Sequence, residues 1–321
     1  MNTEISFIIP HKGREQMLLQ TLDSICQQTL SQDRIEVIVV SQNSEFSDAL
    51  RAYESKLNLT LLLNDPANTI SHSRNLGAQQ ANGRFLAFLD ADVALSENWA
   101  AAMQHILEHR PDTRLASAIQ INSDNATPLE KIRTGLSNAE VDTDVTFLPG
   151  RNLFVKRDTF YQVGGFPEHL VTCEDYFFTG KVSALGRLYY SSDATYVHLG
   201  EDRAFLPMLS KEIWRGQSNV ASLKGRPIPL REWPSFIVPF WVTIGLLSSV
   251  TAAFLTQWTI TLLLLLIGIA PLAAYTVRLK RLVKQDVSIA HCLIFYSLYF
   301  PARAVGTMLG IVAAIGTNSH K

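Results

Sequence analysis

Two aspartates separated by one residue, Asp90 and Asp92, directly follow the apolar run Phe85–Leu89. Carboxylate oxygens are the ligands that Mg²⁺ and Mn²⁺ prefer, and such ions often share their coordination with substrate phosphates. No basic residue lies close to them in the sequence to neutralise both charges. The pattern therefore indicates a divalent cation site. The alternative is structural, with Asp92 capping a helix that begins near Ser96 and Asp90 in a turn.

A second acidic pair, Glu174 and Asp175, stands near the start of a predicted helix, and His198 follows the strand-like run 194–197. Acidic residues in a first helical turn complement the helix dipole, which gives the pair a purely structural alternative. A lone histidine can likewise be an ordinary core or surface residue. Position alone leaves these alternatives open.

Alternating strand and helix patterns position the first of these groups. The strand runs are apolar on successive residues, as expected for a parallel sheet covered on both faces, so the pattern predicts a doubly wound α/β sheet. Ligands bind beyond the carboxyl ends of such strands, where Pro10–Lys12, Ser41–Asn43 and Asp90–Asp92 stand. The predicted strands are 5–10, 35–40, 59–63 and 85–89, and the predicted helices are 16–28, 47–57 and 73–80.

The order and spacing of several segments resemble the family 2 glycosyltransferases of the GT-A fold, which have a mixed, mostly parallel sheet. The resemblance covers nearly all of residues 5–200. The matching segments are the first strand with Pro10, Ser73–Gly77, Gly83–Asp92, Gly164–Glu168 with Glu174-Asp175, and His198.

The resemblance implies a transferase that uses a nucleotide sugar. Asp92, assisted by Asp90, would hold Mg²⁺ or Mn²⁺ against the diphosphate and stabilise the leaving group. His198 would be a further metal ligand or would contact the diphosphate. Asp175 would be the general base that deprotonates the acceptor hydroxyl, giving inversion at the anomeric carbon.

The donor side departs from the family pattern at one point. An Asp-Asp-Gly-Ser type of segment is common at the end of the second strand, and here it reads Ser41–Ser44. Gln42 or Asn43 can still hydrogen-bond a base, so a UDP-sugar is only the default donor. Arg74 either reaches the nucleotide or is a solvated arginine at a helix start. The donor-binding residues that we expect are Pro10, Lys12, Gln42, Arg74, Asp90 and Asp92.

Charge divides the chain, although its net charge of −1 argues against a nucleic-acid binder. Residues 1–232 hold 22 basic and 28 acidic side chains, whereas residues 233–316 hold five and one. The uncharged runs 236–255 and 259–277 are long enough to cross a membrane. The basic segment 278–286 predicts a cytoplasmic loop. The run 288–316, interrupted by Pro301 and Arg303, is one kinked span or an interfacial helix with a shorter span.

We therefore expect three regions: a catalytic domain at 1–202, an amphipathic interfacial segment at 203–235, and about three transmembrane helices at 236–316. Three distant cysteines favour neither a disulfide framework nor a zinc site. The N-terminus has no secretory signal pattern. These features predict an integral inner or plasma membrane protein with a cytoplasmic catalytic domain. Arg303 either binds a lipid phosphate or snorkels towards the interface.

The acceptor is expected to be a membrane-associated lipid-linked molecule or glycan, in surface polysaccharide or glycolipid synthesis. Gly165, Glu174, Trp214 and Arg215 are its candidate contacts. A processive synthase is an alternative, but its gripping motif Gln-x-x-Arg-Trp is replaced here by Lys211–Gln217. The other alternative is an inactive glycosyltransferase-like scaffold.

Overall fold

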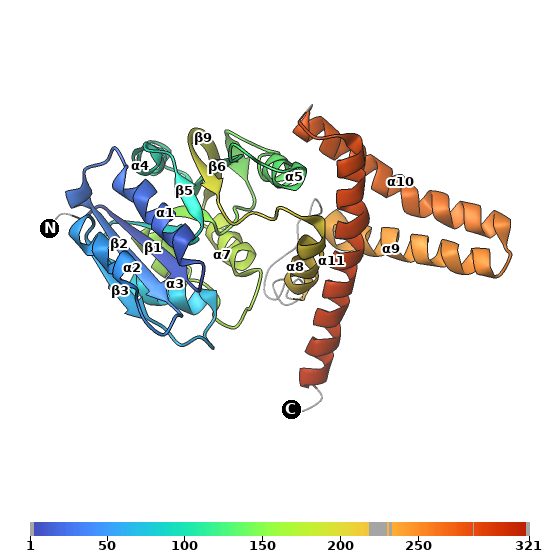
Figure 1. Ribbon diagram of the computed structural model, residues 1–321, viewed down its shortest axis with the longest axis horizontal. Helices are drawn as coiled ribbons and strands as arrows, with labels where there is room; N and C mark the ends of the chain where they lie inside the picture. The colour runs from blue at the N-terminus through green and yellow to red at the C-terminus, as the bar shows by residue number, and fades with distance from the viewer. Residues whose placement is uncertain (1–2, 218–229, 231–232, 285, 319–321) are drawn as a thin grey trace. The chain divides into compact units, whose positions relative to one another are not determined.

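The computed structural model describes residues 3–217, 230, 233–284 and 286–318 (Figure 1). The chain forms two compact units. Unit 1 comprises Met1–Ser123 and Glu140–Gly200, and unit 2 comprises Asp124–Ala139 and Glu201–Lys321. The predicted boundary at residue 202 lies next to the division at Gly200, but the segment 124–139, placed by the sequence in the catalytic domain, clusters with unit 2.

Unit 1 is built on a mixed nine-stranded sheet with the order β3-β2-β1-β4-β8-β6-β9-β5, in which β7 also pairs with β9. The pairs β1–β2, β1–β4, β2–β3 and β6–β9 are parallel. This confirms the predicted doubly wound, mixed α/β architecture. The strands are β1 (Ile5–His11), β2 (Ile35–Ser41), β3 (Leu59–Leu63), β4 (Phe85–Leu89), β5 (Val93–Leu95), β6 (Thr113–Ile121), β7 (Thr143–Val145), β8 (Asn152–Lys156) and β9 (Arg187–His198).

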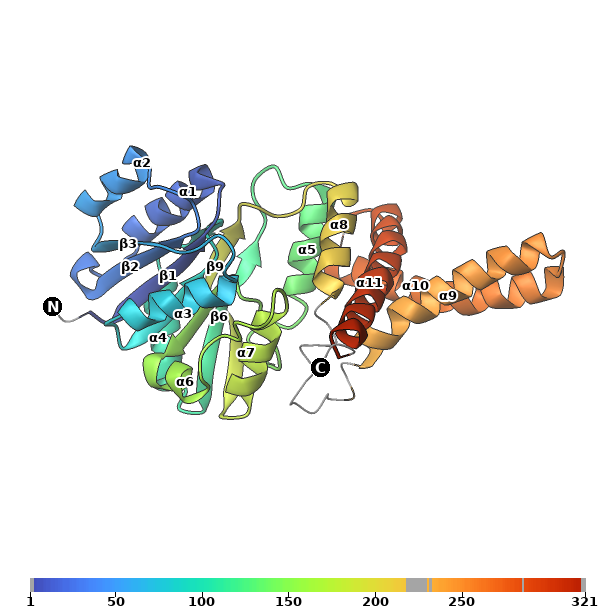
Figure 2. The same cartoon turned by 90° about the horizontal axis from the view of Figure 1, so that it is seen from below.

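Helices cover both faces of this sheet (Figure 2). One buried apolar cluster joins β1 and β2 to α1, α2 and α4, and a second joins β4 and β8 to α3, α6 and α7. The predicted helix 47–57 is instead a short α-helix followed by a 3₁₀ turn at Ala52–Ser55. The helices of unit 1 are α1 (Glu15–Cys26), α2 (Asp48–Arg51), α3 (Ile70–Gln80), α4 (Trp99–His109), α6 (Arg157–Gln162) and α7 (Glu174–Ser183).

The sheet brings three chain segments to one edge. Every residue of β1 and β2 is buried, and their parallel register runs from Ile5 opposite Ile35 to His11 opposite Ser41. β4 runs parallel to β1, so Asp90 emerges beside the end of β1, whose other neighbour is β2. Antiparallel pairing of β5 with β9 places His198 opposite Val93, next to Asp92.

Unit 2 contains α5 (Pro128–Ser137), α8 (Phe205–Gly216), α9 (Trp233–Phe254), α10 (Trp258–Val283) and α11 (Ile289–Asn318). Among the described residues, α9, α10 and the part of α11 at 289–313 are long and apolar enough to cross a membrane. α9 and α10 lie side by side as a hairpin (Figures 1 and 2). The basic segment 278–286, which we predicted as a loop, is helical over Arg278–Val283, because these residues form the last turns of α10. The run 288–316 forms one helix through Pro301, rather than two.

Small residues and one buried carboxylate hold the helices of unit 2 together. Gly245 of α9 crosses Gly268 of α10, where a Cβ at Gly245 would lie 2.9 Å from the Cα of Gly268. Glu212 of α8 is 2 % exposed and forms ion pairs with three arginines. The distances are 2.7 Å to Arg133, 2.7 Å to Arg215 and 3.4 Å to Arg303. Within unit 2, Arg303 is therefore an ion-pair partner of Glu212.

Gly77 lets α3 approach the sheet closely, and α3 carries Arg74. A Cβ at Gly77 would lie 2.5 Å from Cγ2 of Ile8. Gly77→Ala should therefore destabilise the protein by about 1–3 kcal/mol despite the better helix propensity of alanine. Thermal unfolding of the full chain in detergent measures this change. Gln79→Ala, on the exposed side of the same helix, is the control, and an unchanged melting temperature for Gly77→Ala would contradict the packing argument.

Candidate active site

A fully buried arginine organises the first acidic cluster. Arg74 on α3 is 1 % exposed. Its Nη2 lies 2.8 Å from Asp90 Oδ1, and its Nη1 lies 2.9 Å from Glu174 Oε1. The alternative of a solvated arginine at a helix start is therefore wrong. Burial alone would lower the pKa of Arg74, but the charges of Asp90 and Glu174 raise it and keep the guanidinium positive.

Asp175 lies at the same cluster without a direct ion pair among the described contacts. Its Oδ2 accepts from the Gly150 N–H at 3.0 Å, and its Oδ1 accepts from the Tyr176 N–H at 2.7 Å. Burial raises the pKa of Asp175, and the charge of Asp90 adds to this. Burial and the charge of Asp175 likewise raise the pKa of Glu174. A carboxylate with a raised pKa holds a proton more tightly than an exposed one, as a general base must.

Local backbone geometry places this acidic pair. Cys173 adopts a left-handed conformation with φ 62°, and α7 begins at the next residue, so Glu174 and Asp175 occupy its first turn. Gly150 packs against the cluster, where a Cβ would lie 3.0 Å from Arg74 Nη2 and 3.3 Å from Asp175 Cβ. Glu174 and Asp175 therefore complement the dipole at the start of α7, which is the structural role that the sequence allows, and they also belong to the charged cluster at Arg74.

A second cluster surrounds Asp92, which is 6 % exposed. Its Oδ2 lies 2.9 Å from Arg14 Nη1, and its Oδ1 lies 3.4 Å from His198 Nε2. Burial raises the pKa of Asp92, but the His198 hydrogen bond and the charges of His198 and Arg14 outweigh it and hold the pKa below its ordinary value. The structure thus brings the two predicted metal ligands together.

No basic residue lies close to Asp90 and Asp92 in the sequence, but the fold brings distant ones to them. Their basic partners are Arg74 and Arg14, which lie 16 and 78 positions away in the chain. No group of three or more His, Cys, Asp or Glu side chains within the described residues is arranged to hold a metal ion. Asp92 and His198 nevertheless offer an oxygen and a nitrogen donor side by side. This suits a cation that takes its remaining ligands from substrate phosphates and water.

The expected donor residues of the first two strand ends contact a loop. Lys12 Nζ donates to the Pro66 carbonyl at 3.0 Å. Gln42 Nε2 donates to the carbonyls of Asp65 at 3.0 Å and Asn68 at 2.7 Å. Pro10 is buried in β1 opposite Val40. These contacts order the loop before α3.

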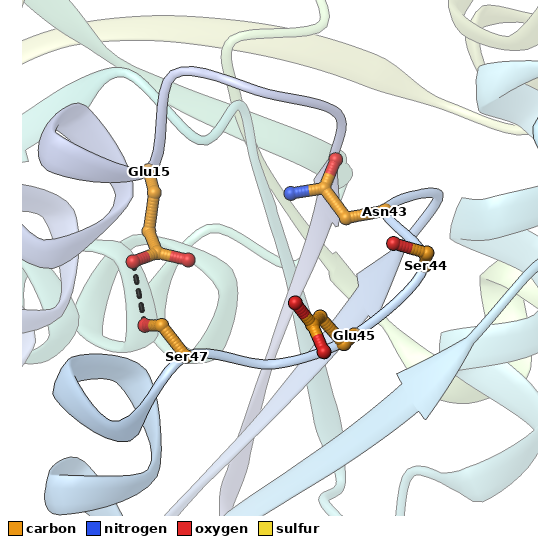
Figure 3. A pocket seen from close by; sticks show the side chains of 5 residues that line it. All are labelled: Glu15, Asn43, Ser44, Glu45 and Ser47. Carbon is orange, nitrogen blue, oxygen red and sulfur yellow. Dashed lines mark hydrogen bonds between the residues drawn. The ribbon is translucent and has the colours of Figure 1, made fainter.

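A cavity of about 380 Å³ opens beside these strand ends (Figure 3). Asn43 Oδ1 accepts from the Gly13 N–H at 2.9 Å, and Glu15 Oε1 accepts from Ser47 Oγ at 2.6 Å. Asn43 was predicted from the sequence as a residue that could bind the base, whereas Glu15 and Glu45 were not. Their position just after the first two strands was the available signal. The cavity is lined by Glu15, Asn43, Ser44, Glu45 and Ser47.

The remaining candidate acceptor contacts lie in different units, Gly165 in unit 1 and Trp214 and Arg215 in unit 2. Gly165 has φ 70° and lies against α3, where a Cβ would be 2.8 Å from Asn75 Oδ1. Asn75 also accepts from the Phe166 N–H at 2.9 Å, so this turn is fixed to the helix that carries Arg74. Trp214 and Arg215 belong to unit 2, where Trp214 is half exposed and Arg215 pairs with Glu212.

Comparisons with known proteins agree with one another. A sequence model of the family described as Glycosyl transferase family 2 matches residues 6–165. The chain is 24 % identical to Glycosyltransferase AglE of Haloferax volcanii over 76 % of this chain and 82 % of AglE. It is 27 % identical to the poly(ribitol-phosphate) beta-N-acetylglucosaminyltransferase TarS of Staphylococcus aureus over 61 % of this chain, but spans only 35 % of TarS.

Two solved structures share the fold. The mannosyltransferase PcManGT from Pyrobaculum calidifontis, in complex with GDP-Man and Mn²⁺, aligns with a TM-score of 0.64 and 18 % identity. That alignment covers 96 % of this chain and 88 % of PcManGT. TarS 1–349 in complex with UDP aligns with a TM-score of 0.51 and 17 % identity, covering 94 % and 90 % of the two chains.

Arg74→Lys should destabilise the protein by about 3–5 kcal/mol, because one ammonium cannot replace a guanidinium between Asp90 and Glu174 and a buried carboxylate loses its partner. Chemical denaturation in detergent measures the loss. The loss should shrink as the pH falls through the raised pKa values of Glu174 and Asp175, because protonation removes the unpaired charge. Arg187→Lys, at an exposed pair with Asp144, is the matched control. Equal stability of the two variants would contradict the role of Arg74.

Proposed function

The chain belongs to the family 2 glycosyltransferases, and from this premise we propose that it transfers a sugar with inversion from a nucleotide diphosphate donor to a membrane-associated acceptor. The observation that carries the proposal is that unit 1 contains both a buried general-base candidate, Asp175, and a donor-side cluster at Asp92. The two carboxylates differ in environment: the pKa of Asp175 is raised, which suits a proton acceptor, and that of Asp92 is lowered, which suits an ionised metal ligand.

On the donor side, Asp92 and His198 would hold Mg²⁺ or Mn²⁺. When bound, such an ion offsets the negative charge that grows on the departing diphosphate. Asp90 is held by Arg74, so its contribution would be to fix the end of β4 rather than to move with the ligand. The Mn²⁺ in the PcManGT structure supports metal use in this fold.

On the acceptor side, Asp175 would accept the proton of the acceptor hydroxyl. The hydroxyl oxygen then bonds to the anomeric carbon while the bond from that carbon to the diphosphate oxygen breaks. Attack from the face opposite the leaving group inverts the configuration. Arg74 is a positioning residue here, because it fixes Glu174 next to the base.

The cavity lined by Glu15, Asn43 and Glu45 is the proposed site of the donor base. Its carboxylates can accept the ring N–H that both uracil and guanine carry, so they replace the acidic residues missing from 41–44. The two solved relatives differ in the nucleotide that they bind, since the PcManGT complex holds GDP-Man and a TarS complex holds UDP. The donor is therefore a UDP- or GDP-sugar in this proposal.

The acceptor and location are inferred from unit 2. Three apolar helices support membrane anchoring, and the basic residues 278–284 at the end of α10 support a cytoplasmic position for that end. The exposed Trp214 on α8 suits a membrane interface. These features favour a lipid-linked or membrane-bound glycan acceptor over a soluble one.

Asp175→Asn should reduce transfer by about 10²–10⁴-fold while donor binding persists, since only proton acceptance is lost. The melting temperature is measured alongside to confirm folding, because an asparagine amide oxygen can accept from only one of the Gly150 and Tyr176 N–H groups. Transfer by the natural protein should decline on acidification at a higher pH than an exposed aspartate would give, since the pKa of Asp175 is raised. A pH–rate profile and nucleotide titration measure these effects. Asp158→Asn, at an exposed acid, is the control, and normal transfer by Asp175→Asn would refute the base assignment.

Asp92→Asn should remove the Mn²⁺-dependent part of donor binding. A thermal-shift screen of UDP- and GDP-sugars with and without Mn²⁺ measures it, because a ligand at 100 times its Kd stabilises the folded state by about 2.7 kcal/mol. The natural protein and the exposed control Asp193→Asn should show the full shift. An unchanged Mn²⁺-dependent shift in Asp92→Asn would exclude Asp92 as a ligand.

A further inference from the structure

The ion pair between Arg14 and Asp92 joins two very different environments. The Arg14 side chain is 61 % exposed, whereas that of Asp92 is 8 % exposed. Arg14 precedes α1 in a left-handed conformation with φ 48°, after Gly13 at φ 64°. This conformation is unfavourable for a residue with a Cβ. The turn therefore keeps a disfavoured backbone that holds an exposed guanidinium over a buried carboxylate.

The surroundings of Asp92 are shaped around this pair. A Cβ on Gly200 would lie 2.7 Å from Arg14 Nη1 and would overlap Asp92 Oδ2, so only glycine leaves room for the two charged groups. His198 occupies the other carboxylate oxygen at 3.4 Å. Both oxygens thus have partners, and the partner at Oδ2 is much the more exposed of the two.

A second pair in unit 1 shows what is unusual about this one. Arg187 and Asp144 also lie 2.9 Å apart, and Arg187 is 62 % exposed, but Asp144 is 41 % exposed. Water can solvate Asp144 when its arginine leaves. Asp92 is far less accessible, so water stabilises its charge less well if the guanidinium moves off, and a cation in the place of Arg14 is favoured.

We propose that Arg14 is a placeholder counter-ion, which neutralises Asp92 while no donor is bound and is displaced from Oδ2 by the divalent cation. This inference rests on the proposed function. The displaced guanidinium then faces a diphosphate, whose oxygens are favourable partners for arginine. Metal and donor would therefore bind cooperatively. Without donor, Arg14 competes with the metal for Asp92, and when the donor is bound its diphosphate pairs with Arg14 and ends this competition.

Binding of Mn²⁺ alone tests the competition. Free Mn²⁺ is measured by electron paramagnetic resonance during titration of the full chain in detergent, without nucleotide. Arg14→Ala should bind Mn²⁺ about fivefold more tightly than the natural protein, because an ion pair no longer competes for Asp92. Arg14→Gly, which suits the left-handed turn, should do the same. Arg14→Lys, which keeps the charge, and the matched control Arg187→Ala should bind Mn²⁺ like the natural protein.

Repeating the titration with saturating UDP or GDP tests the exchange. The difference between Arg14→Ala and the natural protein should then disappear or reverse. Equal Mn²⁺ affinities without nucleotide, or a fivefold difference that persists with nucleotide, would overturn the placeholder. If these affinities are equal but Asp92→Asn abolishes Mn²⁺ binding, the proposed metal site survives without it. If neither the natural protein nor Arg14→Ala binds Mn²⁺, both ideas fail.

Discussion

Carboxylates at the carboxyl ends of buried strands need positive charge close by, and the guanidinium of Arg74 meets this requirement in unit 1. It joins the helix α3, the end of β4 through Asp90, and the start of α7 through Glu174. Because an unpaired buried charge is costly, these three elements are fixed relative to one another. Asp175 follows Glu174 in α7 and so takes its position from this arrangement, whereas its pKa is raised mainly by burial and is lowered by the charge of Arg74.

The two aspartates of the Asp90–Asp92 pair have different surroundings although one residue separates them. Asp90 is tied to an arginine that solvent does not reach, and Asp92 is tied to one that is mostly exposed. One carboxylate is thus suited to holding the architecture and the other to changing its partner. The glycosyltransferase fold accommodates both in the short connection between β4, which ends at Leu89, and β5, which begins at Val93.

Much of this architecture could be predicted from local patterns. The strands Leu59–Leu63 and Phe85–Leu89 were predicted at their observed bounds, because continuous apolar runs between polar turns specify buried strands. Helix ends were harder: α3 begins at Ile70, three residues before the prediction, because Thr69 caps it by accepting from a backbone N–H. The partner of Asp92 could not be predicted, because Arg14 reaches it only through the pairing of distant elements.

The assignment of α5 to unit 2 affects how the protein can be dissected. Leu129 and Ile132 of α5 pack in one apolar cluster with Met208 and Leu279. A recombinant fragment that stops after Gly200 would retain α5 but lose the side chains that cover it. The exposed apolar surface of α5 would then be prone to aggregation. Soluble expression of unit 1 by itself therefore calls for replacing 124–139 with a polar linker as well as removing the C-terminal helices.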